Sequence, residues 1–265
     1  MGKGTMVGVI AAIGAIFGSM VMEGGNPASL IAPPALLLII VGTFGASCAG
    51  TSLDGAIDAL KKIGTLFGNR EFETVALVVR LSGYADTARR DGVLALESKL
   101  GEEDDELVKK GLQLLSDGVE LDEVKKLLVA QAMSEKRRLK QQADFWGKMG
   151  GYAPTLGIIG TVLGLIHTLE ALGGDPAELG HLIGAAFTAT FFGVMFANVF
   201  FLPFGAKATA IADEQLEYHK LVIEGIVGIG AGMNPRLLVD QLGSHLTPEL
   251  RDELNDAGEQ LRKSA

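Results

Sequence analysis

The sequence predicts an all-α fold, a polytopic membrane protein with four transmembrane helices and an α-helical cytoplasmic domain between the second and the third. Hydrophobic residues make up 48% of the 265 residues and 36 are glycine, which is too apolar and too glycine-rich for an ordinary soluble domain of this length. Four stretches each provide the roughly 20 mostly apolar residues that cross a bilayer. All 23 lysine and arginine residues lie outside these stretches.

The four apolar stretches form two hairpins. They comprise residues 4–22, 30–50, 152–172 and 181–204. The loop within each pair is short and rich in Gly, Pro, Asn and Asp, which favour turns. A signal peptide is the alternative for the first stretch. That apolar run ends without a small-x-small cleavage site, so a helix that stays in place is the better interpretation.

Lysine and arginine orient the hairpins. Neither hairpin loop contains Lys or Arg, whereas Lys3, the segment 51–151 and the tail after Pro203 contain all of them. Cytoplasmic regions carry the excess of positive charge, so these three regions are predicted to be cytoplasmic. We therefore expect a multi-pass protein of the bacterial inner (cytoplasmic) membrane with both termini in the cytoplasm.

The segments outside the membrane are predicted to be helical. Between residues 51 and 151, charged residues recur at helical spacing with apolar residues between them, which predicts several amphipathic helices. The tail is predicted to continue the fourth span, to break at 228–235 and to end in a polar helix. The acidic run 102–106 is expected to be a solvated loop or a helix start. The predicted organisation is a first transmembrane hairpin at 1–50, a cytoplasmic helical domain at 51–151, a second transmembrane hairpin at 152–206 and a cytoplasmic tail at 207–265.

Several function classes are excluded by composition and by motifs that the sequence lacks. The net charge of −9 argues against nucleic acid as a partner. The single cysteine, Cys48, cannot form an internal disulfide. The sequence contains no Gly-x-Ser-x-Gly elbow, His-Glu-x-x-His motif, P-loop or Cys/His metal cluster. We therefore expect no enzymatic activity, no catalytic residue, no bound metal and no cofactor.

Four motifs resemble the MotA/PomA family of flagellar motor stator proteins, within the MotA/TolQ/ExbB superfamily. They are Val-Gly-Thr-Phe-Gly-Ala at 41–46, Arg-Arg-Asp-Gly-Val-Leu-Ala-Leu-Glu at 89–97, the stretch 153–165, and Ala-Thr-Phe-Phe-Gly at 189–193 with Pro203 after it. With the two hairpins they cover nearly the whole chain, and the third motif is the most specific. The resemblance implies a stator subunit that couples the inward flow of a permeating cation, Na⁺ or H⁺, to torque on a flagellar rotor.

The resemblance also implies the partners. Several copies of the chain, expected as a pentameric ring, would surround the single spans of a MotB/PomB-type protein that binds peptidoglycan and carries the ion-binding aspartate. The cytoplasmic domain would contact the rotor switch protein FliG, and membrane lipid would surround the spans. The chain fits this division of labour. No Asp or Glu lies near the middle of any of its spans, and an ion pathway normally needs such a group.

Other functions stay open at this point. An energising unit of the ExbB/TolQ kind drives another envelope process and shares the proline-containing third-span motif. That kind has three spans in a different order, and the 89–97 motif also argues against it. A structural membrane scaffold without ion passage, or a similar motor coupled to something other than a flagellum, is also compatible with the sequence.

Thr161 and Thr190 are the candidate ion-path residues. They are equally far in sequence from the middle of the second hairpin loop, so antiparallel helices with a rise of about 1.5 Å per residue hold them at similar depth. Two hydroxyls and nearby carbonyls could supply oxygen ligands to a hard cation. The alternative is that each hydroxyl only bonds the carbonyl one turn back in its own helix. The resemblance favours sodium, because sodium-driven members carry Thr at both positions and many proton-driven members have a small apolar residue at the first.

Pro154 and Pro203 are the candidate conformational-coupling residues. They fall at similar depth near the cytoplasmic ends of the third and fourth stretches. A proline frees a carbonyl one turn back and can leave a hinge, or it can simply mark where a helix leaves the membrane. In the family that this chain resembles, the matching prolines are linked to the step that couples ion passage to torque.

Arg89, Arg90 and Glu97 are the candidate rotor-interaction residues. On one continuous helix Arg89 and Glu97 would lie about 12 Å apart along the axis, too far to pair. Their pattern alone is that of solvated charges on an amphipathic helix. The resemblance implies that they contact the rotor, and it leaves open which of the two adjacent arginines does so.

Small residues at helical spacing predict close packing between the third and fourth stretches. Small side chains let two helix backbones approach each other within a membrane. These residues are Gly157, Gly160 and Gly164 on the third stretch and Gly184, Ala189, Gly193 and Ala197 on the fourth.

Overall fold

The computed structural model describes residues 2–68 and 72–264, and every regular element in these two ranges is a helix. The predicted all-α class is confirmed for this part of the chain. Two compact units are present, each assembled from two segments. The first unit comprises Met1–Arg70 with Arg138–Ile211, and the second comprises Glu71–Arg137 with Ala212–Ala265.

The first unit begins with an apolar helix and then departs from the expected regular second span. After α1 (Gly2–Met22), the second stretch consists of η1 (Pro27–Leu30), α2 (Pro33–Leu37), a π-helical turn η2 (Leu38–Gly42) and α3 (Thr43–Ala49). The expected single span over 30–50 is therefore interrupted. Proline has no N–H to donate and fits only the first turn of a helix, so Pro33 starts a new helix instead of continuing η1.

Length and composition identify helices that could cross a membrane. Three such helices occur among the described residues, namely Gly4–Met22, a window within Leu121–Glu170 and a window within Pro176–Gly230. The apolar helical run Pro33–Ala49 is shorter than this length. A further helix, α4 (Leu53–Lys61), follows it and is capped by Ser52, whose hydroxyl accepts the N–H of Gly55 at 3.2 Å. It leads into η3 (Ile63–Leu66).

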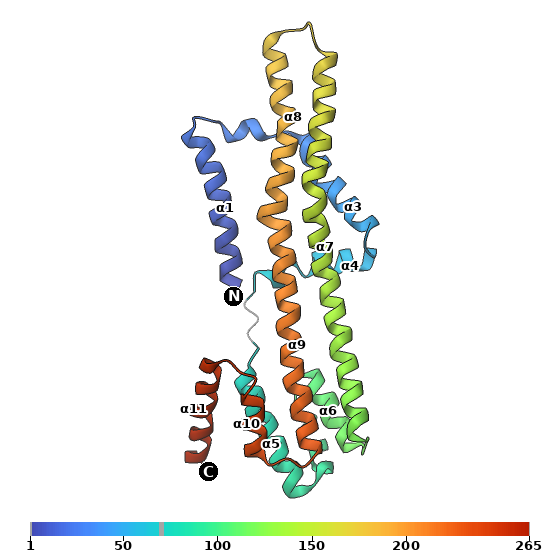
Figure 1. Cartoon of the computed structure of the whole chain (residues 1–265), viewed down its shortest axis with the longest axis vertical. Helices are drawn as coiled ribbons and strands as arrows, with labels where there is room; N and C mark the ends of the chain where they lie inside the picture. The colour runs from blue at the N-terminus through green and yellow to red at the C-terminus, as the bar shows by residue number, and fades with distance from the viewer. Residues whose placement is uncertain (1, 69–71, 265) are drawn as a thin grey trace. The chain divides into compact units, whose positions relative to one another are not determined.

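Two long helices form the second hairpin. The 50-residue helix α7 (Leu121–Glu170) runs without interruption through Pro154, so the expected third span is the second half of a longer helix. Figure 1 shows α8 (Pro176–Phe196) running back along this half of α7. Asp175 caps α8 by accepting the N–H of Ala177 at 3.0 Å. A π-helical turn, η5 (Ala197–Phe201), then joins α8 to α9 (Leu202–Gly230).

Aromatic side chains fix these elements in the core of the first unit. The Trp146 ring on α7 has its centroid 5.5 Å from that of Phe204 on α9 and 6.3 Å from that of Phe201 in η5. Phe145 packs edge to face on Phe44 of α3, with centroids 5.9 Å apart. Such pairs bury large apolar areas, so they hold α3, the π turn and the start of α9 against α7.

The second unit is built around leucine and isoleucine side chains. Leu81, Leu96 and Ile226 are among its fully buried residues. Its remaining elements are α5 (Thr74–Asp91), η4 (Val93–Lys99), α6 (Glu106–Ser116), α10 (Pro235–Gly243) and α11 (Pro248–Ser264). The predicted break at 228–235 is confirmed by the gap between α9 and α10. A second break, before Pro248, was not expected.

The motif 89–97 does not lie on one continuous helix. Gly92 has a φ of +86°, a conformation that L side chains rarely adopt, and it ends α5. The following segment, η4, is a 3₁₀ helix. The separation of about 12 Å expected for Arg89 and Glu97 assumed a continuous helix and does not apply.

Candidate functional site

The two threonines of the second hairpin meet. The Oγ1 atoms of Thr161 on α7 and Thr190 on α8 lie 2.6 Å apart. Thr161 Oγ1 is also 3.2 Å from the carbonyl oxygen of Gly157 and 3.0 Å from that of Ala186. Thr190 Oγ1 is 3.2 Å from the carbonyl oxygen of Gly157. The antiparallel helices thus place the two hydroxyls at the same level and in direct contact.

Some of these contacts join the two helices, which hydrogen bonds within one helix would not do. Gly157 lies one turn before Thr161, so the Thr161 contact with it is the local bond that was the alternative interpretation. The contacts with Ala186 and between the hydroxyls cross from one helix to the other. Two hydroxyl protons cannot serve all of these contacts at once. The result is a compact set of four oxygen atoms, two hydroxyl and two carbonyl.

Glycine makes this approach possible. A Cβ on Gly157 would lie 2.9 Å from the carbonyl oxygen of Ala189, and one on Gly193 would lie 2.5 Å from that of Ala153. Cβ atoms on Gly160 and Gly164 would lie 2.7 and 2.6 Å from alanine methyl groups of α8. The predicted small-residue packing is confirmed at these four positions. It is wrong for Gly184, where a Cβ would meet nothing within 4 Å.

The two proline segments also lie against each other. A Cβ on Gly150, one turn before Pro154, would lie 2.4 Å from the Cδ2 atom and 3.4 Å from the backbone nitrogen of Leu202, which precedes Pro203. The backbone hydrogen-bond pattern changes there from π-helical to α-helical, because the π turn η5 ends immediately before Leu202. A proline and a π turn both disturb the regular backbone ladder. The structure thus brings together Gly150, one turn before Pro154, and Leu202, directly before Pro203.

Sequence reasoning did not single out Asn198. This residue lies in η5, where its side-chain amide donates to the carbonyl oxygen of Val194 at 2.8 Å. With Pro203 and residues of α1, including Thr5 and Gly8, it lines a cavity of about 350 Å³. A polar side chain in an apolar stretch was the available signal.

The charged candidates differ in their surroundings. Arg89, Arg90 and Glu97 are all exposed. Arg90 forms an ion pair with Asp86, one turn back on α5. No ion pair of Arg89 or Glu97 occurs among the residues that the structure describes. Among the described residues, Arg90 thus has an ion-pair partner and Arg89 has none.

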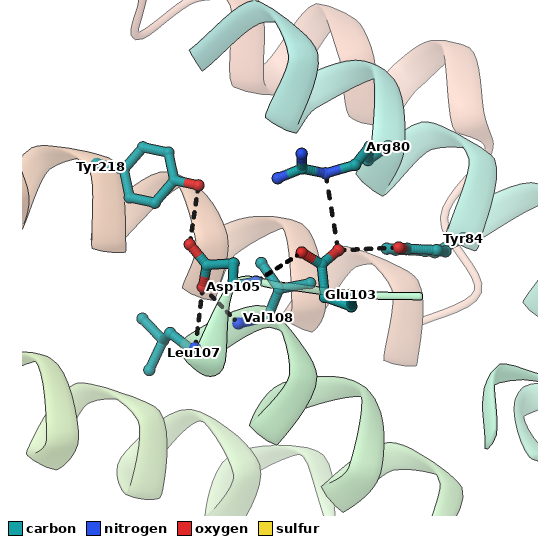
Figure 2. Close-up of polar contacts among 7 residues, drawn as sticks. All are labelled: Arg80, Tyr84, Glu103, Asp105, Leu107, Val108 and Tyr218. Atoms are coloured by element: carbon teal, nitrogen blue, oxygen red, sulfur yellow. Dashed lines mark hydrogen bonds and ion pairs between the residues drawn. The ribbon is translucent and has the colours of Figure 1, made fainter. Parts of the chain in front are cut away.

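The acidic run between η4 and α6 is only partly a solvated loop. Asp105 caps α6, since its Oδ1 accepts the N–H groups of Leu107 and Val108 at 2.9 and 3.0 Å, as a helix start would require. Glu103, in contrast, is buried. Its carboxylate accepts the Tyr84 hydroxyl at 2.8 Å and the backbone N–H of Asp105 at 2.9 Å (Figure 2). The expectation of solvation was wrong for Glu103.

Further polar contacts extend this cluster. The Arg80 guanidinium lies 3.7 Å from the Glu103 carboxylate, and the Tyr218 hydroxyl donates to Asp105 at 2.9 Å. Burial, together with the hydrogen bond to Glu103, raises the pKa of Tyr84 to about 12. Burial and the Asp105 carboxylate raise the pKa of Tyr218 as well. Both tyrosines therefore remain neutral donors at any physiological pH.

Residues 2–68 and 72–264 contain no cluster of side chains suited to hold a metal ion. In the described part of the chain, no group of three or more His, Cys, Asp or Glu side chains could hold a metal ion. The oxygen set at Thr161 and Thr190 contains no charged ligand. A cation there would need a negative charge from outside this oxygen set.

Comparison with known proteins gives consistent matches. The family profile described as Motility protein A N-terminal matches residues 6–90, and that of the MotA/TolQ/ExbB proton channel family matches residues 99–220. Motility protein A of Helicobacter pylori (strain ATCC 700392 / 26695) is 32% identical, over 94% of this chain and 96% of its own.

Two solved structures also resemble this chain over most of its length. A structure of C. jejuni MotAB matches with a TM-score of 0.88 and 30% identity, covering 94% of this chain and 97% of that one. The flagellar MotAB stator complex from Bacillus subtilis matches with a TM-score of 0.85 and 30% identity, covering 94% and 98%.

Proposed function

The chain belongs to the motility protein A family, and from that premise we propose that it is the membrane stator subunit of an ion-driven rotary motor. The observation that carries the proposal is the oxygen set at Thr161 and Thr190, at the contact of two apolar helices. Similar solved chains come from MotAB complexes, one of them titled a flagellar stator complex. A MotB-type protein is accordingly the proposed partner.

The proposed topology has four spans, with both termini and the segment 51–151 in the cytoplasm of a bacterial inner membrane. Three long apolar helices and the distribution of Lys and Arg support it. The run Pro33–Ala49 would be the remaining span, the second in chain order. At about 1.5 Å per residue it is somewhat shorter than a hydrocarbon core of about 30 Å, and η1 would extend it.

Several copies, proposed as a pentamer, would surround the partner's spans with α7 and α8 on the inner side. Hydroxyls and small residues are costly or poorly packed against lipid, so this face is better placed inside an assembly. The partner would supply the carboxylate that the oxygen set lacks. Two hydroxyls and two carbonyls would then complete the shell of a partly dehydrated ion, which favours Na⁺ over H⁺.

Torque would pass to the rotor switch protein FliG through exposed charges. Arg89 and Glu97 are the proposed contacts, with Arg90 held by Asp86 on its own helix. Pro154 and Pro203 would let the contact region at Gly150 and Leu202 change shape as ions pass. A TolQ/ExbB-type unit is a weaker candidate, because the match over residues 6–90 is to a profile of motility protein A alone.

The decisive experiment is rotation in a motile host that lacks its own stators. The chain would be produced with its MotB-type partner, and rotation of tethered cells recorded at fixed membrane potential while external Na⁺ is replaced by K⁺. We expect rotation to be restored and its speed to follow external Na⁺. Absence of rotation with either ion would reject the stator function, whereas speed indifferent to Na⁺ would reject only the sodium assignment.

A further inference from the structure

We infer that a polar cluster around the buried Glu103, in the second unit, positions the segment that carries Glu97, and so sets its spacing from Arg89. The cluster, called the carboxylate clamp below, consists of Arg80, Tyr84, Glu103, Asp105 and Tyr218 (Figure 2). The inference rests on the proposed function, because it assigns the clamp a role in presenting the two charges to a rotor. By the proposal, its members do not contact the rotor themselves.

The clamp connects the two elements that carry the proposed rotor contacts. Tyr84 lies on α5, upstream of Arg89 on the same helix, and Glu103 lies in the loop that follows the Glu97 segment η4. The 2.8 Å hydrogen bond between Tyr84 and Glu103 therefore closes a bridge around Gly92, where α5 ends. Without this bridge, only the packing of η4 would fix the direction of Glu97 relative to Arg89.

The segment η4 needs such a support. A 3₁₀ helix has poorer hydrogen-bond geometry than an α-helix and is weakly stable by itself. Leu96 is fully buried in the core, and the Val93 carbonyl oxygen lies 3.5 Å from the Ser116 hydroxyl. These contacts hold the middle and the start of η4. Its end is followed directly by the loop that Glu103 fastens to α5.

The chemistry of Glu103 makes the bridge specific. Its side chain is only 2% exposed, and a buried carboxylate is stable only where donors replace the lost water. Here the donors are the Tyr84 hydroxyl and the Asp105 N–H, with the Arg80 guanidinium beside them. The Glu103 carboxylate thus has its hydrogen-bond donors only when the loop lies in this one conformation. An apolar side chain at this position would fill space without selecting a direction.

The second half of the clamp ties the loop to α9. Asp105 caps α6 and also accepts the hydroxyl of Tyr218, whose ring stacks on Phe72 with centroids 5.0 Å apart. A load applied at Glu97 would therefore pass through Glu103 to α5 and through Asp105 to α9. Both routes use hydrogen bonds from neutral tyrosines to carboxylates.

The first test measures structure and does not depend on motor function. Amide hydrogen exchange would be recorded on the purified complex for Glu103→Gln and Tyr84→Phe, with Asp104→Asn as the matched control. Asp104 is exposed in the same loop, so its substitution removes a charge and leaves the clamp intact. We expect exchange over Val93–Lys99 to quicken about tenfold in the two clamp variants, as loss of a hydrogen bond to a charged group predicts, with α8 unchanged.

The second test asks whether the clamp acts through Glu97. Torque per stator unit would be read from the stepwise speed increments of loaded motors for Glu103→Gln, Glu97→Ala and the double variant. We expect Glu103→Gln to lower torque per unit at an unchanged number of units, and the double variant to match Glu97→Ala alone. Additive losses, or fewer units at full torque each, would overturn the inference by showing a merely structural role. Unchanged exchange over Val93–Lys99 would overturn it too, even if the unmutated chain drove no rotation and the proposed function had failed.

Discussion

Thr161 and Thr190 each lie within hydrogen-bond distance of the carbonyl one turn before the other, so the two helices exchange contacts across their interface. Thr161 reaches Ala186, Thr190 reaches Gly157, and the hydroxyl oxygens are 2.6 Å apart. This crossed arrangement makes the hydroxyls a shared feature of α7 and α8. Removing either hydroxyl should therefore alter the contacts of both helices.

The first prediction concerns the Thr161 hydroxyl. Thr161→Val keeps the branched shape and removes the oxygen, whereas Thr161→Ser keeps the oxygen. We expect the valine variant to raise the Na⁺ concentration for half-maximal rotation about fivefold, as loss of roughly 1 kcal/mol would do. The serine variant should stay close to the unmutated protein. Equal behaviour of the two variants would show that shape, and not an oxygen ligand, matters at this position.

The second prediction concerns the close approach of α7 and α8. A Cβ on Gly193 would lie 2.5 Å from the Ala153 carbonyl oxygen, so Gly193→Ala must push the helices apart. The expected loss is roughly 1–3 kcal/mol of stability, the usual cost of overpacking. Thermal unfolding of the detergent-solubilised complex would measure it. Gly184→Ala is the control on the same helix, because that position is open. An equal melting temperature for both variants would argue against this contact.

The sequence predicted that the two threonines lie at one level, because in a hairpin of antiparallel helices equal sequence distances from the loop give equal distances along the helix axes; their direct contact comes from the structure. With a fixed rise per residue, Thr161 and Thr190 had to lie at one level once α7 and α8 were antiparallel. The small-residue pattern predicted the close approach at Gly157 and Gly193 for the same reason, since both follow from helix geometry alone. Recognising that α7 and α8 form an antiparallel hairpin was enough to predict both features.

Other features depend on contacts that no local pattern carries. Burial of Glu103 requires Tyr84, nineteen residues earlier, so the acidic run alone suggested solvation. The π turn η5 ends at Phe201, whose ring stacks on Trp146 of a different helix, a contact that the local sequence does not show. The break at Gly92 was accessible, because a glycine after the basic last turn of a helix is a frequent stop signal. The estimate of about 12 Å between Arg89 and Glu97 holds only for a continuous helix, which Gly92 ends.

The third prediction separates the two arginines. Reversing the charge at Arg89 should leave membrane insertion and assembly intact and weaken rotor engagement about two- to fivefold, in the range of one exposed ion pair. Arg90→Gln is the control. It removes a charge that already pairs with Asp86, and it should change torque less. Torque under viscous load would be measured for each variant. Normal rotation of both the Arg89 and Glu97 reversals would identify these residues as solvated charges only.

The fourth prediction concerns Tyr84 in alkali. Its pKa is raised to about 12 by burial and by the bond to Glu103, against an ordinary value of 10. The tyrosinate absorbance that disappears in Tyr84→Phe should therefore titrate near pH 12 in the folded protein. Only three tyrosines are present, which keeps this difference spectrum simple.

The sign of the effect on stability follows from proton binding. Between pH 10 and about 12 the unfolded chain has lost the Tyr84 proton while the folded chain retains it, so the folded state binds more protons. The stabilisation is fully present below pH 10 and is lost as the pH rises toward 12. Tyr84→Phe has no proton to lose, so its stability should fall less over this interval. An ordinary titration near pH 10 in the folded protein would show that the bond between Tyr84 and Glu103 does not form.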